Sequence, residues 1–279
     1  SEVSEEDAAT YRWATKFGAW VLIAGSALTF YTGDAQAKAI TQLQPSKIAA
    51  AEGAFEDTGD FSLLTLPNAD QTGTVVDVKV PAVLSIIAGV PQIKGIDTIR
   101  EQYAQNGYSL QDGSQTKLQS QYAEQLAGKY GGLNPIPDVN ATYWSFRMMM
   151  VFGGLGLLIG IYLLWVIRKG RAPKPSKLWT TLMAAMPLLP LFGISFGWIF
   201  TEMGRQPWLV AGVMPTEAGV SPTASAGDVL FSLIVYTLLY GLLAVIEVGL
   251  FLHYTAKGLP EVTEPKVSDD PDAPMSFAY

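Results

Sequence analysis

Long apolar runs dominate the pattern of this chain. The clearest one extends from Met148 to Ile167 without a charged residue, between Arg147 and Arg168. A helix needs about 20 mostly apolar residues to cross the hydrocarbon core of a bilayer. Residues 142–168 are therefore predicted to form a transmembrane helix.

Three further segments follow the same pattern. Residues 178–202 carry a charge only at their end, and residues 229–254 are interrupted only by Glu247. The run at 17–31 is shorter and spans a bilayer only if upstream aromatic residues lie at the interface. A secretory signal is the alternative for this run, but the acidic start of the chain opposes it. We predict an all-α membrane protein with four transmembrane helices, the first within residues 1–31.

The distribution of basic residues predicts the orientation. The connection at 169–177 is rich in Lys and Arg, whereas Arg205 is the one basic residue of the connection at 203–228. Because Lys and Arg collect in cytoplasmic connections, residues 169–177 and the tail at 255–279 are expected inside, together with the N-terminus. The long segment at 32–141 is then extracytoplasmic.

Local patterns predict a folded domain of mixed structure in this outer loop. Valine occupies every second position of residues 76–80, which favours a strand, and apolar residues recur every four positions through residues 118–130, which favours a helix. Another helix is expected to begin at Pro45. Residues 83–90 are apolar but too short to span, so they are predicted to be buried or to rest on the membrane surface.

The composition narrows the chemistry. Charged residues make up 15% of the chain and hydrophobic residues 49%, which is typical of a membrane protein. With no cysteine and one histidine, the chain alone cannot form a zinc finger, a thiolate iron–sulfur site or a multi-histidine metal centre. The net charge of −7 and the lack of a basic stripe exclude nucleic-acid binding.

Two groups of residues at the outer membrane edge are candidates for chemistry. Arg147 and Met149 offer a cation for haem propionates and a thioether for a haem iron, although an arginine that snorkels and methionines that fill space are the alternative. Trp198 and Glu202 share a helix face, and an ionisable residue at the edge of a span is a functional candidate. The alternative is a helix end with a Glu202–Arg205 ion pair, stopped at proline 207 and anchored at the interface by tryptophan 208.

Other positions predict helix contacts and proton transfer. Glycines four residues apart let helices approach closely, although glycine is also frequent in membrane helices. Glu247 is a candidate proton-relay residue, and His253 is expected to be solvated at the inner interface. The glycine pairs are Gly156 with Gly160 and Gly193 with Gly197.

Three short motifs occur in order along the chain. They are KIAAAE at 47–52, FRMM at 146–149 and GRQPW at 204–208, the last preceded by Gly197-Trp198 and followed by Met214-Pro215-Thr216. In order and spacing they resemble subunit I of the cytochrome bd quinol oxidases. The resemblance extends over nearly the whole chain.

The resemblance implies a role for each matching residue. Met149 would be an axial ligand of a low-spin haem b, with Arg147 beside it. Glu202 would ligate a high-spin haem b, with Arg205 nearby, and Trp198 would lie between that haem and a haem d where oxygen is reduced. A further haem b in place of haem d is left open.

The resemblance also implies an activity at the outer face of a bacterial or archaeal plasma membrane. Quinol would be oxidised there, with Lys47 holding a quinone oxygen and Glu52 acting as the base, and electrons would pass through haems to reduce dioxygen to water. Glu247 is our candidate for proton supply from the cytoplasm. The alternatives are a haem-free four-span scaffold or receptor with an extracytoplasmic ligand-binding domain and, less well supported, a transporter.

Part of the family pattern is missing from this sequence. Family members have additional amino-terminal spans with histidine haem ligands, and His253 is expected on the wrong side of the membrane to replace them. The chain therefore looks like the carboxy-terminal half. The expected partners are the amino-terminal half of subunit I, subunit II, small accessory subunits and membrane lipid.

Overall fold

The computed structural model describes residues 5–106, 134–171, 176–212, 214–221 and 223–259. The helix predicted within residues 118–130 lies outside this part of the chain. The chain divides into two compact units, one of residues 9–220 and the other of residues 1–8 with 221–279. Each unit is described by itself.

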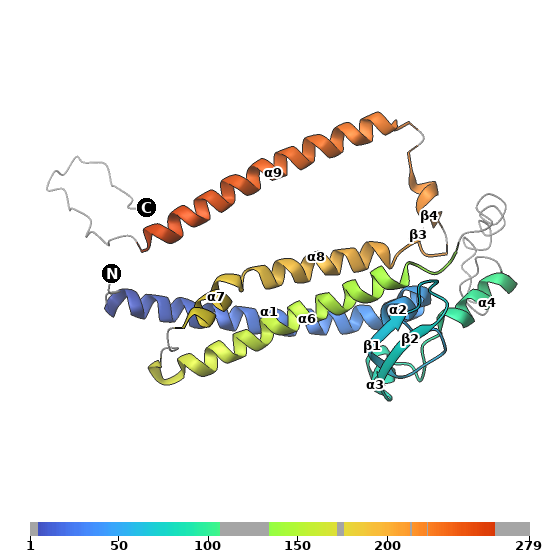
Figure 1. The fold of residues 1–279 in the computed structure, drawn as a ribbon, viewed down its shortest axis with the longest axis horizontal. Coiled ribbons are helices and arrows are strands. Elements are labelled where there is room, and N and C mark those ends of the chain that lie inside the picture. Colours follow the sequence, from blue (N-terminus) through green and yellow to red (C-terminus); the bar gives the residue numbers. More distant parts are fainter. Residues whose placement is uncertain (1–4, 107–133, 172–175, 213, 222, 260–279) are drawn as a thin grey trace, which may run out of the picture. The chain divides into compact units, whose positions relative to one another are not determined.

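Four helices account for the apolar runs of the larger unit (Figure 1). They are α1 (Glu5–Leu43), α6 (Val139–Ile167), α7 (Lys177–Ala185) and α8 (Leu188–Met203). A single 3-10 turn, η1 (Arg168–Gly170), follows α6. Asp138 caps α6 by accepting a hydrogen bond from the backbone N–H of Ala141, as expected for a helix that starts at an acidic residue.

The prediction of four spans is confirmed only in part. Among the described residues, α6 and the later helix α9 are long and apolar enough to cross a membrane, and α7 with α8 would make a third span if the bent pair is counted as one. The bend between α7 and α8 is 43°, at a proline-rich break that the prediction of one transmembrane helix over 178–202 did not anticipate. The first helix does not meet the same measure, because its apolar run is short and diluted by Gly, Ser and Thr. It also continues to Leu43, past the boundary expected at residue 31.

The predicted glycine contacts are confirmed. A Cβ atom at Gly160 would lie 3.2 Å from Leu22 of α1, and one at Gly197 would lie 3.0 Å from the sulfur of Met149. On the same two helices, Phe146 of α6 packs against Phe200 of α8 with ring centroids 4.8 Å apart. Small residues therefore allow α6 to pack closely against both neighbours.

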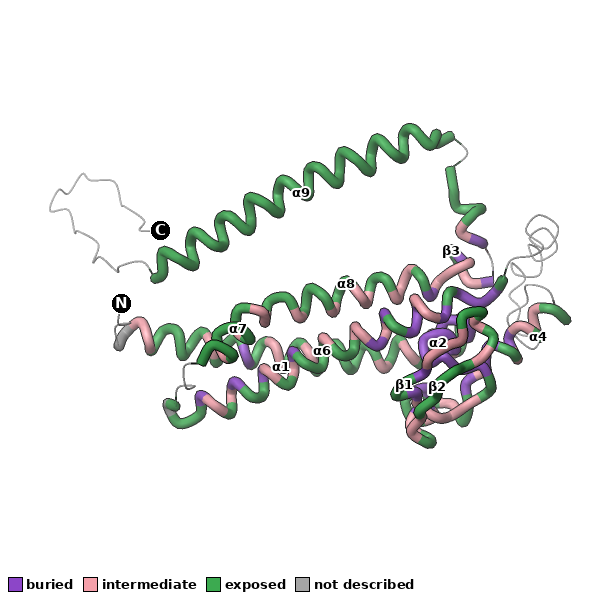
Figure 2. Tube along the Cα trace, in the orientation of Figure 1, coloured by how far each residue is buried: buried purple, intermediate pink, exposed green. Residues whose placement is uncertain are grey.

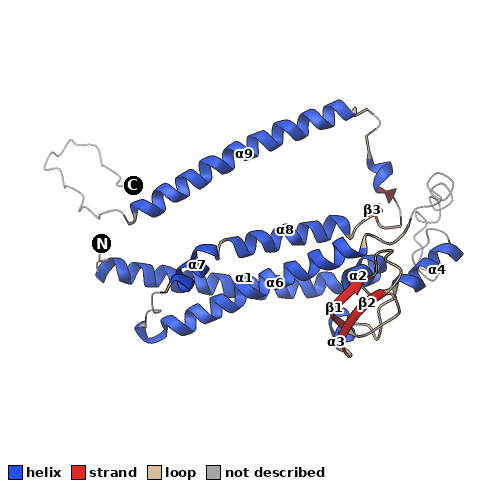
Figure 3. Ribbon diagram, in the orientation of Figure 1, coloured by secondary structure: helices blue, strands red, loops and turns tan. Residues whose placement is uncertain are grey.

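The connection between α1 and α6, predicted to lie outside the membrane and called the outer domain below, is built from short elements around a small core. They are α2 (Pro45–Glu52), β1 (Phe61–Pro67), β2 (Thr74–Val80), α3 (Val83–Ala88) and α4 (Ile96–Asn106). The two strands form an antiparallel hairpin in which Phe61 pairs with Val80 (Figure 3). The predicted strand and the predicted helix start at Pro45 are both confirmed, whereas the sequence pattern did not predict β1.

Helix α2 lies at the centre of this domain. All eight of its residues are buried, as the tube coloured by burial shows (Figure 2). Ala49 and Ala50 pack with Phe55 and Ile96, while Ile48 packs with Leu84 of α3. The apolar run at 83–90 therefore forms a short helix that contributes to the core.

A glycine ends α2. Gly53 has a positive φ of 59°, the left-handed conformation that glycine adopts most easily after a helix. A Cβ atom at this position would lie 2.9 Å from the Thr65 side chain of β1. The turn thus brings the hairpin directly over the end of α2, where Glu52 is located.

Two very short strands, β3 (Trp208–Val210) and β4 (Met214–Pro215), follow α8 and pair antiparallel. They lead into the 3-10 turn η2 (Thr216–Gly219). Trp208 is fully buried here, so the prediction that it anchors the chain at the membrane interface is wrong. It packs within the protein and its ring lies 6.4 Å from that of Tyr103.

The smaller unit contains α9 (Ala226–Lys257). Its start is a capping box, in which Ser225 and Asp228 satisfy each other's backbone N–H groups. Glu247 and His253 lie on this helix, and the His253 ring meets Tyr254 edge-on at 5.4 Å. The proposed proton-relay role of Glu247 stays a prediction.

Candidate functional site

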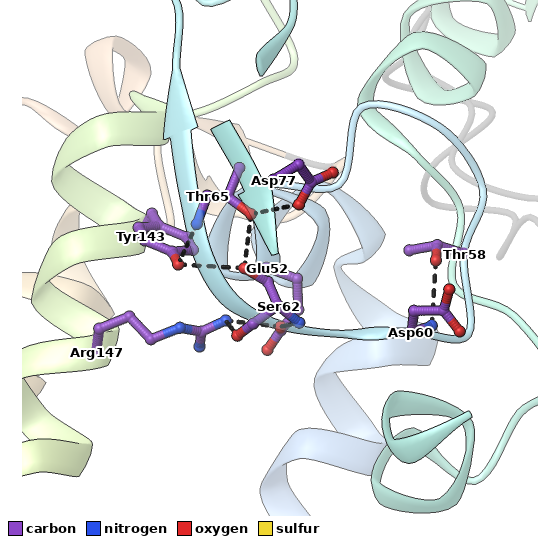
Figure 4. A network of polar contacts seen from close by, with 8 residues as sticks. All are labelled: Glu52, Thr58, Asp60, Ser62, Thr65, Asp77, Tyr143 and Arg147. Carbon is purple, nitrogen blue, oxygen red and sulfur yellow. Dashed lines mark hydrogen bonds and ion pairs between the residues drawn. The ribbon is translucent and has the colours of Figure 1, made fainter. Parts of the chain in front are cut away.

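A buried ion pair joins α2 to α6. The Glu52 carboxylate accepts a hydrogen bond from Arg147 Nη2 at 2.8 Å and one from the Ser62 backbone N–H at 3.3 Å. The same arginine nitrogen donates to the Ser62 carbonyl at 2.7 Å (Figure 4). Glu52 therefore lies between the last turn of α2, the first strand of the hairpin and the N-terminal half of α6.

Two nitrogen atoms of the Arg147 guanidinium take no part in the ion pair with Glu52. Its guanidinium lies 4.7 to 5.2 Å from the ring centroids of Phe61, Tyr143 and Phe146, where ring faces stabilise a cation. Its Nε and Nη1 atoms are buried, and neither has a hydrogen-bond partner among the described residues. Buried donors without partners are costly, so this arginine suits an additional anionic or carbonyl acceptor.

The surroundings of Glu52 raise its affinity for a proton. Burial raises the pKa of this carboxyl group, and this outweighs the opposing effects of Arg147 and of the Ser62 backbone N–H. A carboxyl group with a raised pKa can accept and release a proton closer to neutral pH than an exposed glutamate can. Glu52 thus has a property that suits a general base.

Lys47 lies on a different side of α2 and reaches the end of α8. Its ammonium donates to the Thr201 carbonyl at 3.2 Å and lies 4.8 Å from the Phe200 ring centroid. Burial, followed by the positive charge of Arg205, lowers the pKa of this ammonium, while Glu202 opposes the shift. Lys47 is therefore a buried donor next to the GRQPW motif.

The GRQPW motif folds into a turn that holds α2. Gln44, just before α2, donates to the carbonyls of Gly204 and Arg205 at 3.2 and 3.1 Å. A Cβ atom at Gly204 would lie 3.1 Å from Cγ of Lys47, so the lysine stem packs where a larger residue would interfere. The first and third sequence motifs therefore meet in space.

The haem candidates are spread over α6 and α8. Met149 is half-buried and packs against Gly197, whereas Arg147 faces α2. The two side chains point to different places because residues two apart on a helix differ in direction by about 200°. Trp198 is 69% exposed. Glu202 forms the predicted ion pair with Arg205 at 3.1 Å, and its side chain remains 44% exposed.

Four residues of the site were not identified from the sequence: Ser62, Thr65, Asp77 and Tyr143. Ser62 and Thr65 belong to β1, which lacks strict alternation and so provided no signal. Tyr143 lies four residues before Arg147 on α6, a spacing that places two side chains on one helix face. That spacing was the available clue.

Comparison with known proteins decides the family. A family model described as cytochrome bd terminal oxidase subunit I matches residues 2–259. The chain belongs to this family. Cytochrome bd ubiquinol oxidase subunit 1 of Bacillus subtilis (strain 168) is 34% identical over 236 residues, which cover 81% of this chain and 45% of that relative. Cytochrome bd-II ubiquinol oxidase subunit 1 of Escherichia coli (strain K12) is 29% identical over 270 residues, covering 82% and 52%.

A solved structure shows the same fold. The bd oxidase from Geobacillus thermodenitrificans aligns with a TM-score of 0.58 at 21% identity, covering 90% of this chain and 55% of that one. The chain thus spans about half the length of the subunit I relatives that it matches. Within its described residues, no group of three His, Asp or Glu side chains is arranged to hold a metal ion.

Proposed function

We propose that this chain forms part of a cytochrome bd-type terminal oxidase and carries its quinol-oxidising site at the outer membrane face. The observation that carries the proposal is the position of α2. This buried helix places Lys47 against the end of α8 and Glu52 against Arg147 of α6. The quinol motif thereby contacts both helices that bear the haem candidates.

The two α2 residues suit the two halves of quinol oxidation. A quinol loses two electrons and two protons, so its site needs a donor to hold a quinone oxygen and a base to accept a proton. Lys47 supplies a partly desolvated donor, and Glu52 supplies a carboxyl group whose pKa burial has raised. The two side chains leave α2 in different directions, so we assign them to different parts of the quinol headgroup.

The outer ends of α6 and α8 have donor groups that fit haem. The buried, unsatisfied nitrogens of Arg147 suit a haem propionate, and the accessible Glu202 carboxylate suits a high-spin haem b iron. Met149 offers a thioether for a low-spin haem b, and Trp198 presents an exposed ring beside Glu202 for contact with the high-spin haem b and with a haem d or further haem b. When bound, the haems carry electrons and activate oxygen.

The remaining ligands come from partners in this proposal. An amino-terminal half of subunit I supplies histidine ligands, and subunit II with small accessory subunits completes the assembly in the membrane. We place residues 169–177 and both ends of the chain in the cytoplasm, because basic residues concentrate there. Glu247 then lies toward the inner side, where it takes part in proton supply for oxygen reduction.

The quinol assignment is tested in the assembled oxidase by comparing Lys47→Met with Lys38→Met. Lys38 is an exposed lysine of α1 that pairs with Asp34, so it is a matched control. Loss of a hydrogen bond from a charged donor is worth about 1.5–3 kcal/mol, so Lys47→Met is expected to raise the quinol KM by about 10- to 100-fold. Haem absorption should be unchanged in both variants.

The haem assignment is tested by reduced-minus-oxidised absorption spectra. Met149→Leu is expected to abolish the low-spin haem b band, and Glu202→Ala the high-spin band. A haem-free scaffold or receptor predicts no haem bands in the purified assembly and no spectral change in either variant. Absence of both b-type and d-type bands from the parent assembly would contradict the proposed function.

A further inference from the structure

A chain of hydroxyl groups leads from beside Glu52 to the surface of the outer domain (Figure 4). Tyr143 OH lies 3.1 Å from Ser62 Oγ, which lies 2.6 Å from Thr65 Oγ1. Thr65 Oγ1 in turn donates to Asp77 Oδ1 at 3.0 Å. The three hydroxyl residues are at most 1% exposed, whereas the Asp77 side chain is 27% exposed and pairs with Lys79 at 2.7 Å.

The hydrogen-bond acceptors in this series of hydroxyl groups determine which way the hydroxyl hydrogens point. An ionised carboxylate only accepts, so the Thr65 hydroxyl must donate to Asp77. Thr65 then accepts from Ser62, and Ser62 accepts from Tyr143. Tyr143 OH is itself fixed as an acceptor by the Thr65 backbone N–H at 2.7 Å, which leaves its own hydrogen free for Ser62. Every hydroxyl hydrogen is therefore directed toward Asp77.

The inner end of this series of hydroxyl groups lies at the proposed quinol site. Ser62 provides both the hydroxyl of the chain and the backbone N–H that holds Glu52, and its carbonyl accepts from Arg147. Arg147 also stacks on the Tyr143 ring. The charged groups around the path are thus Glu52 and Arg147 at the inner end and Lys79 beside Asp77 at the outer end.

We propose that Ser62, Thr65 and Asp77 form a proton-exit path that carries a proton of quinol from the buried site to the outer surface, with Tyr143 as a positioning residue. This inference rests on the proposed quinol oxidation. It assigns to the β1–β2 hairpin a function in catalysis in addition to covering α2.

Of the two quinol protons, one is accepted by Glu52 and the other leaves through the hydroxyl groups. A quinol O–H bond breaks, its electrons pass to the haem acceptors, and the proton adds to a lone pair of Ser62 Oγ. The original Ser62 hydrogen moves to Thr65 Oγ1, and the Thr65 hydrogen moves to Asp77. Asp77 then releases it to water, and rotation of the hydroxyl groups restores the starting arrangement.

If the hydroxyl groups have only a structural role, a different result is expected. In that case the hydroxyl groups only fasten β1 to α6, and any residue that preserves the hydrogen bonds preserves the rate. Asp77→Asn separates the two roles, because the amide oxygen still accepts from Thr65 but does not carry a proton outward. Asp60→Asn is the matched control, since Asp60 accepts a backbone N–H at the other end of the same hairpin.

The experiment measures quinol oxidation by the complete oxidase complex at saturating oxygen. Asp77→Asn is expected to lower kcat about tenfold or more with an unchanged quinol KM, and to enlarge the solvent deuterium isotope effect. The residual rate should rise with the concentration of a small weak-acid buffer such as formate, which replaces the missing carboxylate. Asp60→Asn should match the parent enzyme in rate and in its indifference to formate.

Thr65 provides a second, internal test. Thr65→Ser keeps the hydroxyl and should retain the rate, whereas Thr65→Val should slow it as Asp77→Asn does. If Thr65→Val does not assemble, judged by haem absorption, the partly exposed Asp77 still decides the question. Parental kcat and no formate dependence in Asp77→Asn would overturn the exit path while leaving quinol oxidation intact, whereas a parent complex without quinol turnover would overturn the proposed function itself.

Discussion

Two glutamate–arginine pairs in this chain share their chemistry and differ in their surroundings. Glu52 and Arg147 are 2.8 Å apart, with side chains 3% and 10% exposed, and are separated by 95 residues in sequence. Glu202 and Arg205 are 3.1 Å apart, with side chains 44% and 35% exposed, and lie three residues apart at the end of α8. One pair joins distant segments, and the other belongs to a single helix end.

The two pairs differ in how strongly each charged group depends on its partner. Inside the protein, each member of the Glu52–Arg147 pair needs the other to offset its lost hydration. Near the surface, water and ions screen Glu202 from Arg205, so their attraction is weak. The Glu202 carboxylate thus stays available for another ligand, in line with its proposed role at an iron, whereas Glu52 is buried against Arg147.

The largest effect is expected from Arg147→Ala. Removal of this guanidinium leaves a carboxyl group buried without its partner, which typically costs about 3–5 kcal/mol. The thermal unfolding midpoint of the detergent-solubilised assembly should fall clearly, and so should its yield. A midpoint close to that of the parent would mean that the pair contributes little to holding the hairpin and α2 against α6.

A smaller, pH-dependent effect is expected from Glu52→Gln. The pKa of Glu52 is raised from its ordinary value of 4.5, so the folded state holds a proton at pH values where the unfolded state has lost it. The parent therefore loses stability as pH rises from about the ordinary pKa through the raised one. Glu52→Gln lacks this loss and should gain stability relative to the parent over that window, as measured by unfolding midpoints at successive pH values. A constant difference across the window would contradict the assignment.

The smallest effect is expected from Arg205→Ala. Exposed ion pairs contribute about 0–1 kcal/mol, so the unfolding midpoint of the assembly should barely move. High salt should remove what difference remains, because screening weakens such pairs. A loss as large as that of Arg147→Ala would show that Arg205 has a second, buried partner in the assembly.

Local patterns in the sequence predicted several elements correctly. The run before Arg168 became α6, alternation at 76–80 became part of β2, and Pro45 opens α2. The motif order also pointed to the family. In each case the signal lies within one segment, because helix and strand periodicity depend on neighbours close in sequence.

Other features were predictable only in part. The break between α7 and α8 has a local cause in Pro187 and Pro190, which the expectation of a continuous span overlooked. The continuation of α1 to Leu43 was missed because its last part is polar. A polar segment is easily taken for a loop when its packing is unknown. Burial of Trp208 was missed because an aromatic residue after a span is also typical of an interface.

The central pairing of the site was decided by the tertiary structure alone. Sequence motifs identified Lys47, Glu52 and Arg147 as candidates, yet Arg147 was expected beside Met149 rather than in contact with Glu52. The contact forms because Gly53 turns the chain sharply after α2 and the hairpin folds back over it. Helices and candidate residues could be predicted from local patterns in the sequence. A contact between residues 95 positions apart depends on how distant segments pack, and no single segment determines that packing.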